Sequence, residues 1–308
     1  MVAIVSNPNP QATAEAILQT RVDKQEDGRR KHLGGSLIGR DCDRQLWYIF
    51  RWAFNKKHDG RLLRLFMRGH KEEFTFIDEL KSVGVEVQEY DPETGMQFTV
   101  DDCNGHFGGS LDSILLGLLE APKTPHVGEY KTMNDKTFKW LLKNGVEKAK
   151  PEHYAQMQVY MYKKGLTRAF YMAVNKNDDE VYTERLSINT PFAIRLIAKA
   201  DRIINSDEPP VTTRKADFYE CKWCDFNHIC HQKQRPERNC RTCLHSTPIE
   251  NGNWHCQKHN KGRDEKEMRI AQPCHRYIPA LVPMTQTDHD GENIIYEGWI
   301  DDGTEKAA

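Results

Sequence analysis

The residues best suited to chemistry lie in two apolar, strand-like runs between positions 109 and 131. Glu129 and Lys131 are two residues apart, so in an extended segment their side chains share one face while Tyr130 points the other way. Asp112 lies in the first run, and pairing of the two runs would bring it beside Glu129. Two carboxylates and a lysine suit a hard cation, Mg²⁺ or Mn²⁺, with the Tyr130 carbonyl as a further oxygen ligand. Such an ion lowers the pKa of a bound water, which the lysine can orient or deprotonate.

A Glu-x-Lys on a strand is also common as a solvated ion pair, so the neighbouring motifs matter. Upstream, a helical period of apolar residues places His70 and Glu73 on one face. Downstream, a helix with Pro151 in its first turn places Gln156 and Tyr160 one turn apart, although Gln156 alone also fits a surface amide. The apolar positions of the upstream helix are Phe66, Phe74, Ile77 and Leu80.

In this order the motifs resemble the PD-(D/E)XK nuclease superfamily, in particular its RecB/AddB-like and phage-exonuclease branch. The resemblance covers about residues 36–230 and implies an α/β core of the restriction-endonuclease type, a small mixed sheet flanked by helices. It implies that Asp112, Glu129 and Lys131 hold the metal ion against a phosphodiester. It also implies a further metal ligand from the pair His70 and Glu73, and a Gln-x-x-x-Tyr motif formed by Gln156 and Tyr160.

Cysteines are the second source of information. The chain has nine, and without a secretory signal they indicate metal or cluster ligation before disulfides. Cys221, Cys224 and Cys230 form a first group at close spacing. Resemblance to AddB-like and CRISPR-associated relatives implies Cys42 as the fourth ligand of a [4Fe-4S] cluster that clamps distant parts of the chain together. A zinc ion in the same four sulfurs, or unrelated buried cysteines, are the alternatives.

A second group comprises Cys240, Cys243, Cys256 and Cys274. The Cys-x-x-Cys and a turn at 251–253 predict a zinc ribbon or zinc knuckle that binds Zn²⁺. The last ligands are less specific, and the histidines that are alternatives to Cys256 or Cys274 are His255, His259 and His275. Cys103 remains, and we expect it to be a small apolar filler.

Length and charge set broad limits. The chain has 308 residues, 38% of them hydrophobic, which suffices for a sizeable core plus an appendage. It has no long apolar run and no signal peptide at its start, so we expect no membrane partner and a cytoplasmic location, the host cytoplasm if the chain is phage-encoded. The net charge of −1 hides an uneven distribution, because positions 286–308 carry seven acids and one lysine. An acidic tail therefore masks a more basic body that suits DNA.

The elements expected around these motifs alternate between helices and strands, which predicts an α/β layer architecture. One helix is expected from Ser36 through the run that ends at Phe54, with Ser36 as its cap. Strands are expected at 168–174 and 181–188, followed by a helix that ends at Ile204. The predicted domains are an N-terminal extension (1–35), a nuclease core with the iron–sulfur cluster (36–235), a cysteine-rich zinc-binding module (236–280) and a flexible acidic tail (281–308).

Three functions compete on these grounds. The favoured hypothesis is a metal-dependent DNA nuclease of phage or recombination and repair type, an exonuclease rather than an endonuclease, which could act with a recombination or replication partner protein. The second is a non-catalytic nucleic-acid-binding protein with metal-stapled modules. The third is a structural protein whose cysteines hold it together. The complete set of Asp112, Glu129 and Lys131 favours the first, because a degenerate nuclease would be expected to have lost one of these charges.

Overall fold

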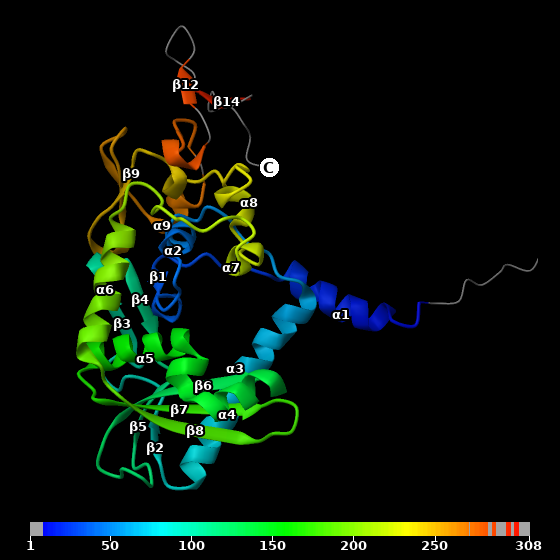
Figure 1. The fold of residues 1–308 in the computed structure, drawn as a ribbon, viewed down its shortest axis with the longest axis vertical. Coiled ribbons are helices and arrows are strands. Elements are labelled where there is room, and N and C mark those ends of the chain that lie inside the picture. Colours follow the sequence, from blue (N-terminus) through cyan, green and yellow to red (C-terminus); the bar gives the residue numbers. More distant parts are fainter. Residues whose placement is uncertain (1–8, 271, 283–284, 288–293, 297–298, 302–308) are drawn as a thin grey trace, which may run out of the picture.

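The structure, a computed structural model, describes residues 9–270, 272–282, 285–287, 294–296 and 299–301. The predicted acidic tail lies largely outside these ranges. Within them, no helix is long and apolar enough to cross a membrane. Figure 1 shows a lower part built on one sheet, an upper part that holds the C-terminal segments, and helix α1 (Ala12–Asp23) projecting to one side.

The lower part is a mixed five-stranded sheet with the strand order β2-β5-β6-β7-β8. Strands β6 and β7 are parallel, and the other neighbours are antiparallel. The predicted hairpin of β7 and β8 and the predicted mixed α/β class are both confirmed. The strands are β2 (Glu86–Gln88), β5 (Ser113–Leu116), β6 (His126–Met133), β7 (Arg168–Asn175) and β8 (Val181–Ser187).

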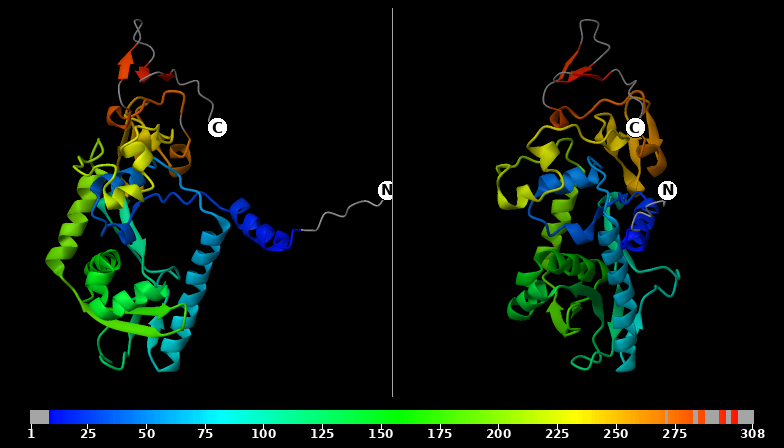
Figure 2. Two further views of the ribbon diagram at one scale, coloured as in Figure 1. Left: turned by 45° about the vertical axis from the view of Figure 1, so that its right-hand side comes forward. Right: turned by 90° about the vertical axis from the view of Figure 1, so that its right-hand side faces the viewer.

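Helices cover both faces of this sheet. Helix α3 (Gly60–Ser82) packs on one face, where Phe76, Ile77 and Leu80 meet alternate residues of β5, β6 and β7. The other face carries α4 (Asp135–Ala149) and α5 (Pro151–Lys164), with α6 (Thr190–Ile204) packed against α5. As Figure 2 shows, α3 runs along the side of the molecule away from α6. The sheet therefore lies between two apolar layers.

The apolar stripe predicted for α3 is only half right. Ile77 and Leu80 are buried, but Phe66 and Phe74 are 46% and 62% exposed. The reason is that the sheet covers only the C-terminal half of this long helix, while its N-terminal half lies against α1. Phe66 instead borders the cleft described below.

Two predicted elements are split in the structure. The helix expected from Ser36 is a short 3₁₀ turn, η1 (Gly35–Leu37), followed by α2 (Asp43–Phe50). Between them Gly39 packs against the first turn of α5, where an added Cβ would lie 2.7 Å from Glu152 Cα. The strand-like run expected from Ser110 to Leu118 is interrupted, because Ser110 ends β4 (Phe107–Ser110) and β5 begins only at Ser113. The two strands belong to different sheets, and Asp112 lies at the bend between them.

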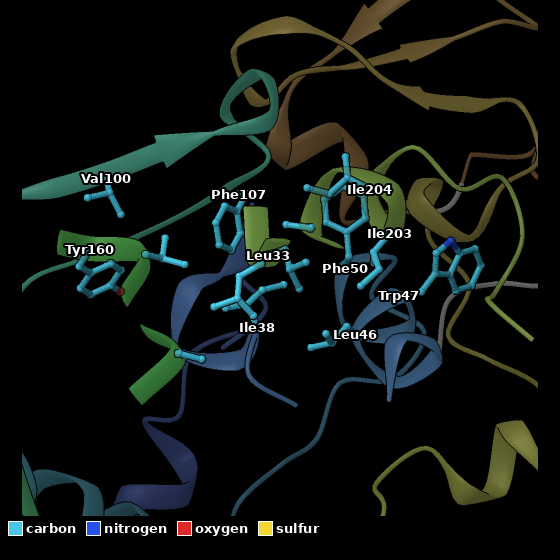
Figure 3. Close-up of a cluster of buried hydrophobic side chains, with 14 of the residues drawn as sticks. Leu33, Ile38, Leu46, Trp47, Phe50, Val100, Phe107, Tyr160, Ile203 and Ile204 are labelled. Carbon is cyan, nitrogen blue, oxygen red and sulfur yellow. The ribbon is translucent and has the colours of Figure 1, made fainter. Parts of the chain in front are cut away.

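A second sheet, in the order β1-β4-β3, joins β4 to β1 (Leu33–Gly34) and β3 (Thr99–Asp102), and η2 (Cys103–Gly105) follows β3. It packs with α2, α5 and α6 in one hydrophobic cluster, part of which Figure 3 shows. Tyr160 of α5 and Phe50 of α2 both lie in this cluster. The upper and lower parts of the molecule are therefore tied together through α5.

The C-terminal segments form the upper part. The predicted turn at 251–253 joins two strands of a small antiparallel sheet in the order β11-β10-β9. Six buried residues of this region belong to the same hydrophobic cluster as α2 and α5: Trp254, Met268, Tyr277, Ile278, Leu281 and Val282. The remaining elements are α7 (Tyr219–Lys222), α8 (Asn227–Cys230), η3 (Cys240–Thr242), β9 (Ser246–Pro248), η4 (Glu250–Gly252), β10 (Trp254–Cys256), β11 (Lys261–Arg263), α9 (Glu265–Met268), η5 (Pro279–Leu281), β12 (Thr285–Thr287), β13 (Ile294–Tyr296) and β14 (Trp299–Asp301).

Candidate active site

Strand β6 places the predicted catalytic side chains on the face of the sheet that α5 covers. Glu129 of β6 receives a hydrogen bond from Gln156 of α5, and Lys131 lies on the same side. Tyr130 points to the opposite face, where its hydroxyl and that of Ser113 are 2.6 Å apart. This alternation follows from the period of two in a strand. The Tyr130 carbonyl, a predicted metal ligand, accepts a hydrogen bond of 2.9 Å from Lys131 Nζ.

Glu129 lies at the centre of the arrangement and is 0% exposed. Its Oε1 lies 2.5 Å from Lys131 Nζ, and its Oε2 accepts a hydrogen bond of 3.0 Å from Gln156 Nε2. Asp112 Oδ2 is 3.8 Å from Lys131 Nζ and accepts a hydrogen bond of 2.9 Å from the Tyr130 backbone N–H. The bend between β4 and β5 thus brings Asp112 to β6, and the triad and Gln156 form one cluster.

The charges of this cluster shift one another's pKa. Burial, together with the nearby carboxylate of Asp112, raises the pKa of Glu129 to about 7, against the lowering effect of Lys131. Burial would lower the pKa of Lys131, but Glu129 and Asp112 outweigh it and hold that pKa above its ordinary value. Lys131 is therefore a cation in this arrangement, which favours orienting a water over deprotonating it.

A cleft of about 500 Å³ opens beside the triad between α3 and β6 and reaches Lys131. The predicted residues His70 and Glu73 line it, with His70 Nδ1 3.5 Å from Glu73 Oε1. Burial and the charge of Asp112 raise the pKa of Glu73, so Glu73 lies within electrostatic reach of the triad. The structure therefore brings the upstream helix motif to the same site as the triad.

Two cations that the sequence did not single out also line this cleft, Arg30 and Lys176. Arg30 lies in the predicted N-terminal extension (1–35), and Lys176 lies in the turn that joins β7 to β8. Charge was the one property of these two residues that the sequence displayed, and many surface residues are charged. Together with Lys131 they make the cleft suited to a phosphate backbone.

Tyr160 lies one turn beyond Gln156 on α5, and its ring is buried against two glycines. A Cβ on Gly35 would lie 3.0 Å from Tyr160 Cε1, and one on Gly109 would clash with the Tyr160 hydroxyl. Burial and the charges of Glu129 and Asp112 hold the Tyr160 pKa above its ordinary value. Tyr160 therefore lies between the triad and the second sheet, and its raised pKa keeps it a neutral phenol.

The donors around the triad fit a hard cation in type. Glu129 Oε1 is buried and faces the Lys131 ammonium at 2.5 Å. Asp112 and Glu73 add carboxylates within electrostatic reach of Glu129. Across the described ranges, no three His, Cys, Asp or Glu side chains are already arranged to hold a metal ion. Oxygen donors of this kind are those that Mg²⁺ and Mn²⁺ prefer.

Cation binding at this site should weaken as the pH falls through about 7, where Glu129 takes up a proton. A proton and the metal compete for the same carboxylate, so we expect the Mn²⁺ affinity to fall by about tenfold per pH unit below that value. Calorimetric titration with Mn²⁺ on either side of neutral pH measures this. The same titration of Glu129→Gln should show weak binding with no such slope, and an equal slope in both proteins would contradict the assignment.

The first cysteine group comes together from distant parts of the chain. Cys42, Cys221, Cys224 and Cys230 all line one small cavity of about 20 Å³. Burial and the thiols of Cys42, Cys224 and Cys230 hold the pKa of Cys221 above its ordinary value. Gln45 Nε2 lies 3.3 Å from Cys224 Sγ and donates a hydrogen bond to it. Four cysteines that line one cavity are the ligand type and number that a cluster or a zinc ion requires, although they are not arranged as a metal site in the described residues.

The second cysteine group lies beside the sheet of β9, β10 and β11. Burial raises the pKa of Cys240 to about 11, and Cys243 and Cys274 contribute to that rise. Burial also raises the pKa of Cys243, and the thiols of Cys274 and Cys256 contribute to that rise. His259 Nε2 lies 3.0 Å from Cys274 Sγ, whereas His275 is buried with its Nε2 3.3 Å from Thr242 Oγ1. Of the alternative histidine ligands, His259 therefore lies in contact with a cysteine of this group.

No family model matches the chain, and no curated protein does either. Solved structures that are similar to it include the following three. The crystal structure of SSO0001 has 16% sequence identity and a TM-score of 0.41, and the match covers 71% of this chain and 96% of that chain. The alkaline exonuclease LHK-Exo from Laribacter hongkongensis has 18% identity and a TM-score of 0.39, and the match covers 57% of this chain and 87% of that chain. A phage-related exonuclease from Haemophilus somnus 129PT has 13% identity and a TM-score of 0.36, and the match covers 52% of this chain and 76% of that chain. At such low identities and TM-scores, none of them carries weight for the function of this chain.

Proposed function

We propose that this protein is a divalent-metal-dependent DNA nuclease, and an exonuclease rather than an endonuclease. The observation that carries the proposal is the buried Glu129, held between Lys131 and Gln156 with Asp112 beside it. Burying a carboxylate is costly because desolvation favours its neutral form, and groups perturbed in this way cluster at functional sites. The adjoining cleft with its cations supplies a place for a phosphodiester backbone.

Each residue has a role in this proposal. Asp112, Glu129 and the pair His70 and Glu73 would hold Mg²⁺ or Mn²⁺, which when bound activates a water and stabilises charge on the phosphate. Lys131 orients the attacking water and faces the developing negative charge. Gln156 fixes the rotamer of Glu129 through its hydrogen bond.

The test is an assay of the purified protein on end-labelled linear DNA and on circular DNA of the same sequence, with Mg²⁺ or Mn²⁺. Degradation of the linear substrate alone supports an exonuclease. Cleavage of both substrates would keep the nuclease and overturn the exonuclease mode. Binding without cleavage of either would overturn the proposal in favour of a non-catalytic nucleic-acid-binding protein.

The cysteine groups belong to the same proposal as structural sites. Cys42, Cys221, Cys224 and Cys230 would hold a [4Fe-4S] cluster, which when bound links α2 to the segment after α6. Cys240, Cys243, Cys256 and Cys274 would hold Zn²⁺, with His259 as an alternative ligand at Cys274. What supports this is that the first four cysteines line one cavity, and that cysteines of the second group raise one another's pKa.

Protein purified without oxygen should be brown and contain about four irons per chain, as a cubane cluster requires. Replacing Cys42 or Cys221 with Ser should remove both colour and iron, as measured by absorption and metal analysis. Cys103→Ser is the matched control, because Cys103 lies outside both groups, with its Sγ 3.9 Å from the Ile197 carbonyl. A colourless protein that contains zinc at both sites would contradict the cluster.

A further inference from the structure

The segment that carries Arg30 into the cleft is held by its backbone. Three consecutive carbonyls, those of Arg29, Arg30 and Lys31, each accept a hydrogen bond from a different side chain. The donors are Arg269 Nη2 at 3.0 Å, Trp52 Nε1 at 2.8 Å and Arg241 Nη2 at 2.6 Å, in that order. Two of these donors come from the cysteine-rich C-terminal region, more than two hundred positions away in sequence.

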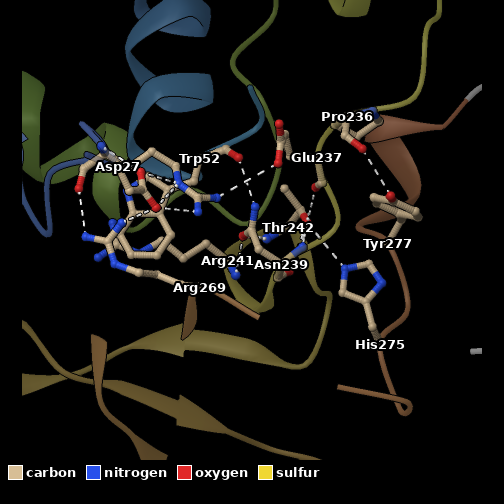
Figure 4. A network of polar contacts seen from close by, with 11 residues as sticks. Asp27, Trp52, Pro236, Glu237, Asn239, Arg241, Thr242, Arg269, His275 and Tyr277 are labelled. Atoms are coloured by element: carbon tan, nitrogen blue, oxygen red, sulfur yellow. Dashed lines mark hydrogen bonds and ion pairs between the residues drawn. The ribbon is translucent and has the colours of Figure 1, made fainter. Parts of the chain in front are cut away.

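Trp52 is the centre of this arrangement, and Figure 4 shows the polar contacts around it. The Arg241 guanidinium lies over the Trp52 ring at 3.7 Å from its centroid, and those of Arg269 and Arg29 lie at 4.9 and 5.3 Å. The Trp52 carbonyl accepts a hydrogen bond of 2.9 Å from Asn239 Nδ2. Trp52 is 1% exposed and has a φ of 53°, which a bulky residue adopts only where its surroundings impose it.

Salt bridges add to the hydrogen bonds. Asp27 pairs with Arg29 at 2.6 Å and with Arg269 at 2.5 Å. Burial would raise the pKa of Asp27, but hydrogen bonds from these two arginines hold it well below its ordinary value. Such an acid stays ionised across the neutral range. Residues 27–31 are thus anchored at a side chain and at three carbonyls by Arg269 and Arg241 of the C-terminal region and by Trp52. Arg30 lines the cleft, and its Nη1 donates a hydrogen bond of 3.4 Å to Ser36 Oγ.

We propose that Arg269 and Arg241, with Trp52, are positioning residues for Arg30, so that the cysteine-rich region sets where a cation of the nuclease cleft meets the DNA backbone. The proposal rests on the proposed nuclease function. An unanchored chain segment would lose conformational entropy each time Arg30 met a phosphate, and the anchoring removes most of that cost.

The test is a double-mutant cycle on the full-length protein. Arg30→Ala should raise KM by about tenfold and reduce the log–log salt slope of duplex DNA binding by about 0.9, since one phosphate contact is lost. Arg269→Gln should give part of both effects, with kcat unchanged. In the Arg30→Ala background, Arg269→Gln should add nothing, because its effect passes through Arg30.

Trp52→Phe is a second variant, which removes the indole N–H and keeps an aromatic ring under Arg241. Lys266→Gln is the control, because Lys266 is an exposed cation on α9, the short helix just before Arg269. Hydrogen exchange of residues 29–33 should speed up in Arg269→Gln and not in the control, even at unchanged thermal stability.

Additive effects of Arg269→Gln and Arg30→Ala, or unchanged exchange at 29–33, would overturn the positioning role while leaving the nuclease intact. Wild-type protein that neither binds nor cleaves DNA would overturn the proposed function and this inference with it. The two failures are therefore distinguishable, because the first occurs in an active wild-type enzyme.

Discussion

Glu129→Gln should abolish DNA cleavage and leave the fold intact. The amide keeps the volume of the carboxylate and its place beside Gln156, but it removes the charge that would bind a metal ion. Loss of a group that acts on the transition state costs about 10²–10³-fold or more in rate. Asp112→Asn and Lys131→Met should be comparably inactive in the same assay of end-labelled DNA. A Glu129→Gln enzyme with wild-type rate would contradict the proposed site.

The thermal stabilities of Glu129→Gln and Lys131→Met should differ, and the difference separates the effect of removing a buried charge from that of leaving one unpaired. The pKa of Glu129 is raised to about 7 by burial, so its folded-state stabilisation is present below its unfolded pKa of 4.5 and is lost as the pH rises through about 7. Above neutral pH, Glu129→Gln should therefore not lower the thermal midpoint in the absence of metal. Lys131→Met leaves Glu129 buried without its ion pair and should lower that midpoint clearly. Glu86→Gln, an exposed change on β2, is the control for both.

A chain that ends at Arg235 should fail to form a stable core. It lacks six buried side chains of the shared hydrophobic cluster: Trp254, Met268, Tyr277, Ile278, Leu281 and Val282. At about 1.5–3 kcal/mol for each buried large side chain, their loss matches the whole stability of a typical domain, about 5–15 kcal/mol. It also lacks Asn239 and Arg241, which bond the Trp52 and Phe50 carbonyls.

The matched control for this truncation is a chain that ends at Val282, because it keeps every residue of the cluster. Solubility, circular dichroism and thermal unfolding of the two chains measure the difference. The division of the chain at residue 235 stays a prediction, and a folded, cooperative 1–235 fragment would support it against the packing argument. A Val282 chain that also fails to fold would show that later residues contribute to the core.

Local patterns were enough to predict several elements near the site. The hairpin of β7 and β8, the helix α5 with Pro151 in its first turn and the opposite faces of Glu129 and Tyr130 all depend on residues close in sequence. Helix α2 was predicted as part of one long helix, because no sequence signal showed that Gly39 would be pressed against α5. The exposure of Phe66 and Phe74 was missed for a similar reason, since the extent of the sheet under α3 is set by other strands.

By itself, the sequence determined the kinds of group available: an aspartate, a Glu-x-Lys, a helical Gln-x-x-x-Tyr and two sets of cysteines, each spaced by the repeat of a strand, helix or turn. Only the tertiary structure decided which of them meet. It brings Asp112 to Glu129 through a bend between two sheets, Cys42 to Cys221 across most of the chain, and Arg241 to the carbonyl of Lys31. Side-chain periodicity is a local property of the backbone, whereas these contacts depend on packing between elements distant in sequence, which no local pattern encodes.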